Sequence, residues 1–370
     1  MCKEVVVTGS AGFIGSHVCD ELRRRGYVVR DFDVWTNPQQ DVRDPWAVMD
    51  ALNGADAVLH LAAEPYIPYC YQNPKLFFET NANGTLNVLM AAKRFGIGRV
   101  IYWSTSEVYG TAQRNPMDES HPLNPHSTYA VSKLAADRLC LTFYKEHSVP
   151  VVILRQFNCY GPRETQPYVI PEIIKQLAIG PNLTLGNVDA ERDFTYVEDA
   201  ARAAVDLMEC EEAIGEVVNI GTGVCWRIED IATQLGKTMG YDEVSIRTDV
   251  ARLRPFDVDR LVCDSAKLRR LIGWKPSIGL EAGLQKTADW FRGNGGKWDF
   301  RRNRERPGQA GLRGQLREAA PDRIQAGDGH GSGDRGAREG VRDGEPREPL
   351  LELLWIGEKN GKKPRGNIDG

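Results

Sequence analysis

The sequence has no apolar run that approaches the ~20 residues needed to span a bilayer. It begins with MCKEVVVTGS, which passes from charged residues directly into a short apolar strand. A signal peptide would show a longer apolar stretch and a small-residue cleavage site. We therefore expect a cytoplasmic protein that does not associate with a membrane.

Patterns of cysteine and histidine that build disulfide or metal sites are also missing. None of the eight cysteines forms a C-x-x-C pair, and the six histidines form no H-E-x-x-H motif. Scattered thiols of this kind are typical of buried free cysteines in a reducing compartment. We expect no disulfide framework and no metal.

Net charge and size narrow the class of protein further. The formal net charge is −4, whereas a nucleic-acid-binding protein shows a clustered basic face. We therefore expect no nucleic-acid partner. With 370 residues, 41% of them hydrophobic, the chain is long enough for two domains or for one domain with a substantial extension.

Short apolar runs alternate with segments of helical spacing over residues 1–155. The strand-like runs are EVVVTG, VVRDFD, AVLHLA, RVIYWS and VPVVILRQF, and long helical patterns lie at 13–26, 74–96 and 127–147. Buried strands separated by helices indicate a parallel sheet with helices on both faces. The predicted fold class is α/β, with a Rossmann-type doubly wound parallel sheet in residues 1–155 that binds the cofactor.

Two further regions follow this sheet. Residues 156–294 contain shorter helices and strands such as EVVNIG, and we expect a smaller C-terminal substrate-binding region that partly returns to the sheet. Residues 295–370 are rich in Gly, Arg, Asp and Glu, with no Phe or Tyr after Phe300. Such a composition buries too little apolar surface to offset the ordering of the chain. We expect a disordered tail, although a frameshifted or fused end would look the same.

The first strand runs into a glycine-rich turn, VVVTGSAGFIG, which places Gly9, Gly12 and Gly15 at the start of a helix. A backbone without β-carbons turns tightly and approaches a pyrophosphate, whose charge lies at the helix N-terminus. Glycines between a strand and a helix therefore predict a dinucleotide site, which also takes in Phe13 and Ile14.

The second strand ends at Asp33, close to the ~20 residues beyond the glycine turn where an acid binds the ribose hydroxyls. A carboxylate there would repel a 2′-phosphate, which favours NAD over NADP. Arg30 leaves NADP open, because a nearby arginine can accept that phosphate. The alternative is a turn of ordinary loop glycines followed by an exposed aspartate.

The segment STYAVSK contains Tyr129 and Lys133, four residues apart on one face of a predicted helix. A nearby ammonium lowers the pKa of a phenol, and the positive charge of an oxidised nicotinamide adds to this effect. The product is a general base that takes a hydroxyl proton as hydride leaves the same carbon. Alone, Y-x-x-x-K is common and usually marks a solvated helix face.

A carboxylate also follows the buried run RVIYW, in the stretch STSEVYG at residues 104–110. Glu107 stands there among hydroxyl residues at the end of a predicted strand. It is either an ordinary edge residue that faces water or a group that transfers a proton, and the stretch alone leaves both open.

Taken in order, these motifs resemble the extended short-chain dehydrogenase/reductases of the NAD-dependent epimerase/dehydratase family. The resemblance runs over residues 3–292 and rests on TGSAGFIG, DVRD, HLAA, STSEVYG, YAVSK, RQFNCYGPR, RDFTYVEDAARA and RPFDVDR. The pattern is most similar to the 4,6-dehydratases that act on nucleotide-linked N-acetylhexosamines. The resemblance implies a tightly bound, recycled NAD and a nucleotide diphosphate sugar held between the two regions.

The resemblance also assigns binding residues. Asp41 and Val42 would lie near the adenine, and Leu61, Ala62 and Ala63 would line the cofactor. The sugar nucleotide would be held by Asn158, Arg192 and Arg254. An arginine suits a diphosphate because its planar fork gives charge-assisted, paired hydrogen bonds. The alternatives are surface ion pairs for the arginines and an ordinary turn residue for the asparagine.

The resemblance gives the strand end a catalytic role. Thr105 would bind the sugar 4-hydroxyl beside Tyr129 and Lys133. The dTDP-glucose 4,6-dehydratases carry Asp-Glu next, whereas Ser106 and Glu107 of this chain match the GDP-mannose 4,6-dehydratases. Oxidation at C4 acidifies the C5 proton, and Glu107 is suited to remove it. Ser106 is too weak to replace an acid at C6, so either Glu107 serves twice or a bound water acts.

Other readings of the same residues stay open. A 5,6-dehydratase would use the same glutamate, whereas a 4-epimerase or a UDP-glucuronate decarboxylase would leave Glu107 without a proton to remove. A dinucleotide-binding sensor would commonly lack Tyr129 or Lys133. The resemblance further implies a homodimer that uses helices near residues 75–95 and 127–146.

Overall fold

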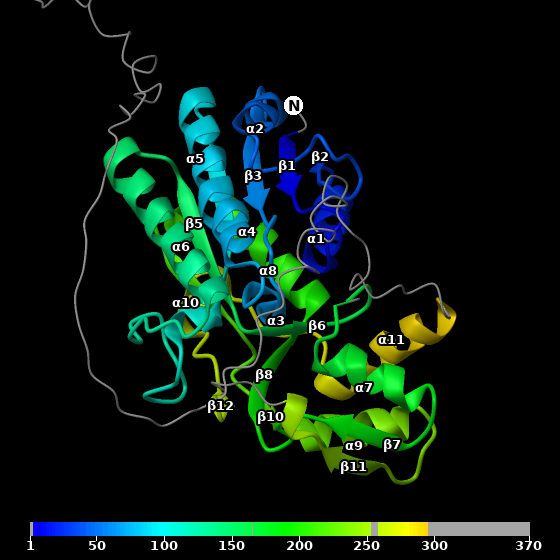
Figure 1. The fold of residues 1–370 in the computed structure, drawn as a ribbon. Helices are drawn as coiled ribbons and strands as arrows, with labels where there is room; N and C mark the ends of the chain where they lie inside the picture. The colour runs from blue at the N-terminus through cyan, green and yellow to red at the C-terminus, as the bar shows by residue number, and fades with distance from the viewer. Residues whose placement is uncertain (1–2, 165, 253–257, 295–370) are drawn as a thin grey trace, which may run out of the picture. The chain divides into compact units, whose positions relative to one another are not determined.

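The computed structural model describes residues 3–164, 166–252 and 258–294. The predicted tail and Arg254 lie outside the described residues. Within them, one sheet of six parallel strands has the order β2-β1-β3-β4-β5-β9 (Figure 1). Its strands are β1 (Glu4–Thr8), β2 (Val28–Phe32), β3 (Ala57–His60), β4 (Arg99–Thr105), β5 (Val151–Gln156) and β9 (Val217–Ile220).

Helices cover both faces of this sheet, which confirms the predicted doubly wound α/β fold. One face carries α1 (Phe13–Arg24), α8 (Val197–Glu209) and α10 (Ala266–Ile272). The other carries α2 (Pro45–Leu52), α5 (Gly84–Phe95) and α6 (Thr128–His147), with α5 and α6 in contact (Figure 1). All seven residues of β4 are buried, as expected for a strand that is covered on both sides.

The sheet reverses its winding next to β1, since β2 pairs with one edge of β1 and β3 pairs with the other. Ligands of doubly wound sheets bind in the crevice at such a switch point, outside the carboxyl ends of the strands. Here those ends carry the glycine turn after β1, Leu61 after β3 and the STSEVYG stretch at the end of β4. The topology therefore brings the sequence motifs to one edge.

The helical pattern at 74–96 is not one continuous helix. It comprises α4 (Pro74–Phe78), a π-helical turn η1 (Glu79–Asn83) and α5, and it follows the short α3 (Ile67–Cys70). In the π turn, the side chain of Asn81 bonds both backbone polar groups of Glu64 and the hydroxyl of Ser132, at 2.8–3.1 Å. The wider turn therefore ties the loop after β3 to α6.

Residues beyond 156 build a second core and also return to the sheet. The second core holds α7 (Val169–Leu177), α9 (Ile228–Thr238) and α11 (Leu280–Gly293). The strands here are β6 (Asn158–Tyr160), β7 (Asn182–Leu185), β8 (Glu191–Tyr196), β10 (Cys225–Arg227), β11 (Ser245–Thr248) and β12 (Arg260–Leu261). Short 3-10 turns are η2 (Ser106–Tyr109), η3 (Glu211–Ala213) and η4 (Val250–Arg252).

Candidate active site

A cavity of about 760 Å³ lies at the carboxyl ends of the parallel strands and extends toward the second core. It brings together the predicted cofactor, catalytic and substrate residues, apart from Arg254, which lies outside the described residues. Their individual roles stay predictions. The lining residues predicted from the sequence are Gly9, Gly12, Phe13, Ile14, Gly15, Asp33, Asp41, Val42, Leu61, Ala62, Ala63, Thr105, Ser106, Glu107, Tyr129, Lys133, Asn158 and Arg192.

The glycine turn leaves the start of α1 open to an anion. Gly12 caps the helix with an extended backbone and offers no side-chain hydrogen bond. The first backbone amides of α1 therefore stay available to a ligand in the cavity that Gly12 lines. Gly9 has a φ of +75°, and a β-carbon there would lie 2.7 Å from the amide nitrogen of Ala62. A β-carbon on Gly15 would collide with the carbonyl oxygen of Gly9. The turn therefore fits a pyrophosphate and requires glycine at these positions.

Asp33 is buried at the end of β2 and is held by two backbone amides. Its Oδ2 accepts a hydrogen bond from the amide of Ala11 at 3.0 Å, and its Oδ1 accepts one from the amide of Trp35 at 2.8 Å. Each carboxylate oxygen has a further lone pair for a ribose hydroxyl. Asp41 lies nearby in the cavity lining, in an ion pair with Arg43. This end of the cavity therefore fits the ribose of a dinucleotide.

Tyr129 and Lys133 lie in the first turns of α6, which begins after the N-cap Ser127. The ammonium of Lys133 donates a hydrogen bond to the carbonyl of Trp103 at 2.6 Å and lies 4.5 Å from the ring centroid of Tyr102. Burial lowers the pKa of Lys133 to about 8, while the charge of Asp137 opposes this shift.

The phenol of Tyr129 differs from the sequence expectation. Burial raises its pKa well above the usual range, a side-chain hydrogen bond with Thr105 lowers it in part, and the charge of Glu107 raises it. The expected lowering of this pKa by Lys133 is not among the causes of the shift; the Lys133 ammonium donates its hydrogen bond to the carbonyl of Trp103 instead. The protein alone therefore keeps the phenol protonated, and a general base at this position needs additional positive charge from a ligand.

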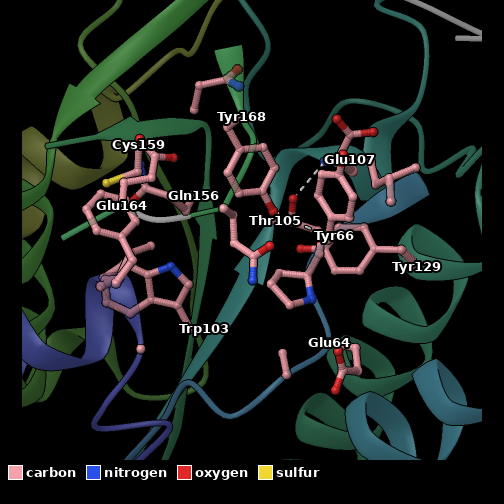
Figure 2. Close-up of a pocket in the computed structure, with 18 of the residues that line it drawn as sticks. Glu64, Tyr66, Trp103, Thr105, Glu107, Tyr129, Gln156, Cys159, Glu164 and Tyr168 are labelled. Carbon is pink, nitrogen blue, oxygen red and sulfur yellow. Dashed lines mark hydrogen bonds between the residues drawn. The ribbon is translucent and has the colours of Figure 1, made fainter. Parts of the chain in front are cut away.

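Thr105 organises the end of β4. Its hydroxyl caps the 3-10 turn η2 by accepting a hydrogen bond from the amide of Glu107 at 3.2 Å (Figure 2). Ser106 is buried and Glu107 is half-buried, and both line the cavity. One hydroxyl thus positions both the phenol of Tyr129 and the backbone that carries the carboxylate of Glu107.

The substrate end of the cavity lies toward β8. Asn158 and Arg192 line it, and Nη1 of Arg192 donates to the carbonyl of Glu191 at 3.0 Å. Arg252 also lines the cavity and forms a 3.0 Å ion pair with Glu172, although the sequence analysis did not single it out. Arg252 lies two residues before the RPFDVDR motif, and this position could have marked it as a lining residue.

Several lining residues were missed from the sequence. Tyr66 and Tyr168 approach each other edge to face at 5.9 Å, and the hydroxyl of Tyr168 donates to the carbonyl of Pro65 at 3.2 Å (Figure 2). Glu64 directly follows the HLAA motif, which was a usable signal. Gln156 lies inside the RQFNCYGPR motif and Glu164 directly follows it, whereas no motif marks Trp103.

The part of the chain that the structure describes holds neither a metal site nor a membrane-spanning helix. No group of three or more His, Cys, Asp or Glu side chains there could hold a metal ion. No helix in the same residues combines the length and apolar character needed to cross a membrane. Seven cysteines in this part of the chain are free thiols.

Comparisons with known proteins agree on one family. A family model described as GDP-mannose 4,6 dehydratase matches residues 30–287. The UDP-N-acetyl-alpha-D-glucosaminuronate decarboxylase of Bacillus cytotoxicus is 32% identical over 79% of this chain and 98% of its own length. The dTDP-glucose 4,6-dehydratase of Streptomyces venezuelae, solved with NAD bound, has a TM-score of 0.74 and 31% identity over 80% of this chain and 99% of that chain.

A third relative has a different activity. The UDP-glucose 4-epimerase of Thermotoga maritima, solved with UDP-glucose, has a TM-score of 0.72 and is 29% identical over 79% of this chain and 99% of that chain. Dehydratase, decarboxylase and epimerase thus share this fold at similar identity.

Proposed function

Because the chain belongs to the GDP-mannose 4,6-dehydratase family of NAD-dependent extended short-chain dehydrogenase/reductases, we propose that it is a nucleotide-sugar 4,6-dehydratase. The family as a whole contains dehydratases, decarboxylases and epimerases of sugar nucleotides. The choice of dehydratase is carried by one observation. The hydroxyl of Thr105 accepts a hydrogen bond from the backbone amide of Glu107 and lies close enough to the phenol of Tyr129 to lower its pKa, so a carboxylate stands beside the group that meets the sugar 4-hydroxyl.

Tyr129 and Thr105 are assigned to the 4-hydroxyl. NAD, when bound, supplies the hydride acceptor at C4 and the hydride donor at C6. The phenol of Tyr129 takes the proton of the 4-hydroxyl, and the hydroxyl of Thr105 orients the same oxygen. The buried site opposes the phenolate, so the positive charge of the oxidised nicotinamide, when bound, would add to that of Lys133 in favouring it.

Glu107 is assigned to the C5 proton. Once C4 is a ketone, the C5–H bond is acidic, and the half-buried carboxylate removes that proton. The C6 hydroxyl leaves as water, which requires a proton. Ser106 is a very weak acid, so Glu107, protonated in the preceding step, returns its proton to the leaving oxygen. The C5–C6 double bond left by this elimination would take up a hydride at C6 and a proton at C5, which balance the hydride and the proton removed from C4 and its hydroxyl. The net change is loss of one water from the sugar.

The substrate is proposed to be a nucleotide diphosphate linked to an N-acetylhexosamine or a hexose. Its sugar would lie over Thr105 and Tyr129, and its diphosphate beside Asn158 and Arg192, with Arg254 completing the site. Residues 1–155 would supply the cofactor half and residues 156–294 the sugar-nucleotide half. We further propose a homodimer that buries the faces of α5 and α6.

Product mass tests this function. Purified protein is incubated with a panel of UDP-, GDP-, dTDP- and CDP-linked sugars, including UDP-N-acetylglucosamine, first without added NAD. We expect one sugar nucleotide to lose one water. Glu107→Gln should lower this turnover at least 100-fold, because a proton-transfer group contributes about 10²- to 10⁴-fold. Glu146→Gln, at an exposed position near the end of α6, is the matched control.

Each alternative gives a different product. A new stereoisomer of unchanged mass would identify a 4-epimerase, and loss of carbon dioxide from a uronate would identify a decarboxylase. Either result would show that the assignment of Glu107 is wrong. An exocyclic alkene that retains the 4-hydroxyl would identify a 5,6-dehydratase and would keep the role of Glu107.

A further inference from the structure

Three buried polar side chains on one side of the cavity lack partners in the part of the protein that the structure describes. They are Nε1 of Trp103, Oε1 of Gln156 and Oε2 of Glu164. The residues are only 6%, 6% and 3% exposed, and all three line the cavity. Buried polar groups are ordinarily hydrogen-bonded, since an unmet donor or acceptor costs free energy. Their arrangement therefore indicates a ligand group.

The three side chains are held by the parallel sheet and by a segment fixed to it through α1. Trp103 lies two residues before the end of β4, and Gln156 ends β5. The segment that carries Glu164 is fixed to α1, because His17 donates a hydrogen bond to the carbonyl of Pro162 at 3.0 Å and Arg163 pairs with Asp20 at 2.7 Å. Glu164 lies beside Cys159, across the cavity from Glu107 and Tyr129 (Figure 2).

The chemistry of the three groups defines what they complement. An indole Nε1–H only donates, whereas Oε1 of Gln156 only accepts. Nε2 of Gln156 faces the carbonyl of Ile220 at 3.4 Å, which leaves Oε1 for another partner. Burial raises the pKa of the Glu164 carboxyl well above its usual range, which favours the neutral acid, whose O–H donates a hydrogen bond. Two donors and an acceptor match a primary carboxamide.

We propose that Trp103, Gln156 and Glu164 form an amide-binding pocket that receives the carboxamide of the cofactor's nicotinamide ring. Trp103 and Glu164 would donate to the carboxamide oxygen, and Gln156 would accept from its N–H₂ group. The acetamido group of a sugar substrate presents similar chemistry. The position of the three side chains on β4, β5 and the segment fixed to α1 favours the cofactor, because the parallel sheet and α1 also carry the glycine turn. The proposal rests on NAD binding but not on dehydration.

Equilibrium binding to the full-length, nucleotide-free chain tests the pocket. The ligands are NAD, its 3-acetylpyridine analogue, which replaces the N–H₂ group by a methyl group, and ADP-ribose, which lacks the ring. Glu164→Leu should weaken NAD about tenfold, the usual scale of one hydrogen bond to a buried group, and should leave ADP-ribose unchanged. Glu164→Gln should retain most of the affinity for NAD, because a neutral amide also donates and accepts.

Gln156→Leu gives a second, independent test of the pocket. The unaltered protein should bind NAD about tenfold tighter than the 3-acetylpyridine analogue, and this ratio should approach one in the variant, because the N–H₂ group loses its acceptor. Thr195→Val is the matched control. The Thr195 hydroxyl is also buried without a partner among the described residues, but it does not line the cavity. It should leave every ratio unchanged.

Two results would overturn the proposal. If Glu164→Leu weakens ADP-ribose as much as NAD, the residue supports the fold rather than the carboxamide. If the ratios between NAD and its analogue do not change, but the preference for UDP-N-acetylglucosamine over UDP-glucose falls, the amide belongs to the sugar. An epimerase would give the same binding ratios as a dehydratase, so failure of the proposed reaction is distinguishable from failure of this pocket.

Discussion

Asp33 combines two tasks in one carboxylate. It fixes the glycine turn through the amide of Ala11 and the following loop through the amide of Trp35. The remaining lone pairs of its oxygens face the expected position of a ribose, where a 2′-phosphate would meet a negative charge. The charge, rather than the acceptor geometry, is therefore what should exclude NADP.

Replacement of Asp33 by asparagine tests this at the residue scale. Asp33→Asn removes the charge and keeps one carbonyl acceptor, so the affinity ratio of NAD to NADP should fall about tenfold or more, as for loss of one close charge–charge repulsion. Calorimetric titration measures both affinities. Asp31→Asn, two residues earlier in β2 and half-exposed, is the matched control and should leave the ratio unchanged. Equal weakening of both nucleotides would show that Asp33 only supports the loop.

Lys133 makes folding stability depend on pH. Its folded pKa is about 8, lowered by burial, whereas an unfolded chain has a lysine pKa of about 10.4. Between these values the unfolded state binds more protons, so the contribution of this group to stability rises with pH. Below pH 8 the folded state carries a buried charge at a cost.

The expected signature is a pH-dependent difference between two proteins. The free energy of unfolding of the unaltered chain, minus that of Lys133→Met, should increase between pH 7 and pH 10 by on the order of 3 kcal/mol. Urea unfolding of nucleotide-free protein at several pH values measures it. A difference that does not change with pH would contradict the assignment of a lowered pKa to Lys133.

At the scale of elements, α6 presents the proposed catalytic groups, and its two ends are built differently. Ser127, two residues before Tyr129, caps the start of the helix: its hydroxyl accepts a hydrogen bond from the amide of Ala130 at 3.1 Å. Ser148 ends the helix in a left-handed conformation with a φ of 55°, which favours glycine.

Substitutions at the two ends should therefore act in opposite directions. Ser127→Ala should lower the free energy of unfolding by about 1 kcal/mol and reduce turnover, because it loosens the turn that carries Tyr129. Ser148→Gly should raise the free energy of unfolding by about 0.5–1 kcal/mol and leave turnover unchanged. Urea unfolding and product formation measure both. Unchanged turnover in Ser127→Ala would show that the cap does not position the phenol.

The sequence identified what is local and missed what the topology assembles. The glycine turn, Asp33 and the pair Tyr129 and Lys133 are each recognisable within a short segment, because strand, turn and helix follow one another. Trp103 and Glu164 belong to segments about 60 residues apart in the chain, and only the strand order places them in one cavity. The π-helical turn at Glu79–Asn83 has the same apolar spacing as the helix around it, so periodicity could not separate them.

At the scale of the whole molecule, exposed apolar side chains mark the proposed dimer face. Phe78, Met90 and Val131 are 39–41% exposed and belong to α4, α5 and α6. Helices α4 and α5 both pack against α6 in the structure. A second copy of the chain would cover this apolar surface.

A charge on this face should disrupt the assembly. Met90→Glu and Val131→Glu together should halve the mass measured by light scattering during gel filtration, because two carboxylates would be buried without partners. Ile179→Glu, at an exposed apolar position outside these helices, is the control and should leave the mass unchanged. A monomer in the unaltered protein would contradict the proposed dimer.

The return of α8 and β9 to the sheet has a consequence for synthesis on the ribosome. Apolar residues of α1, such as Val18 and Leu22, are covered by α8, more than 170 positions later in the chain. A nascent chain that has emerged only to residue 155 has its glycine turn and the proposed catalytic tyrosine, but α1 alone covers that side of the sheet. Release of residues 197–274 is therefore the translational event that completes this half, and until then the growing chain exposes a surface that chaperones recognise.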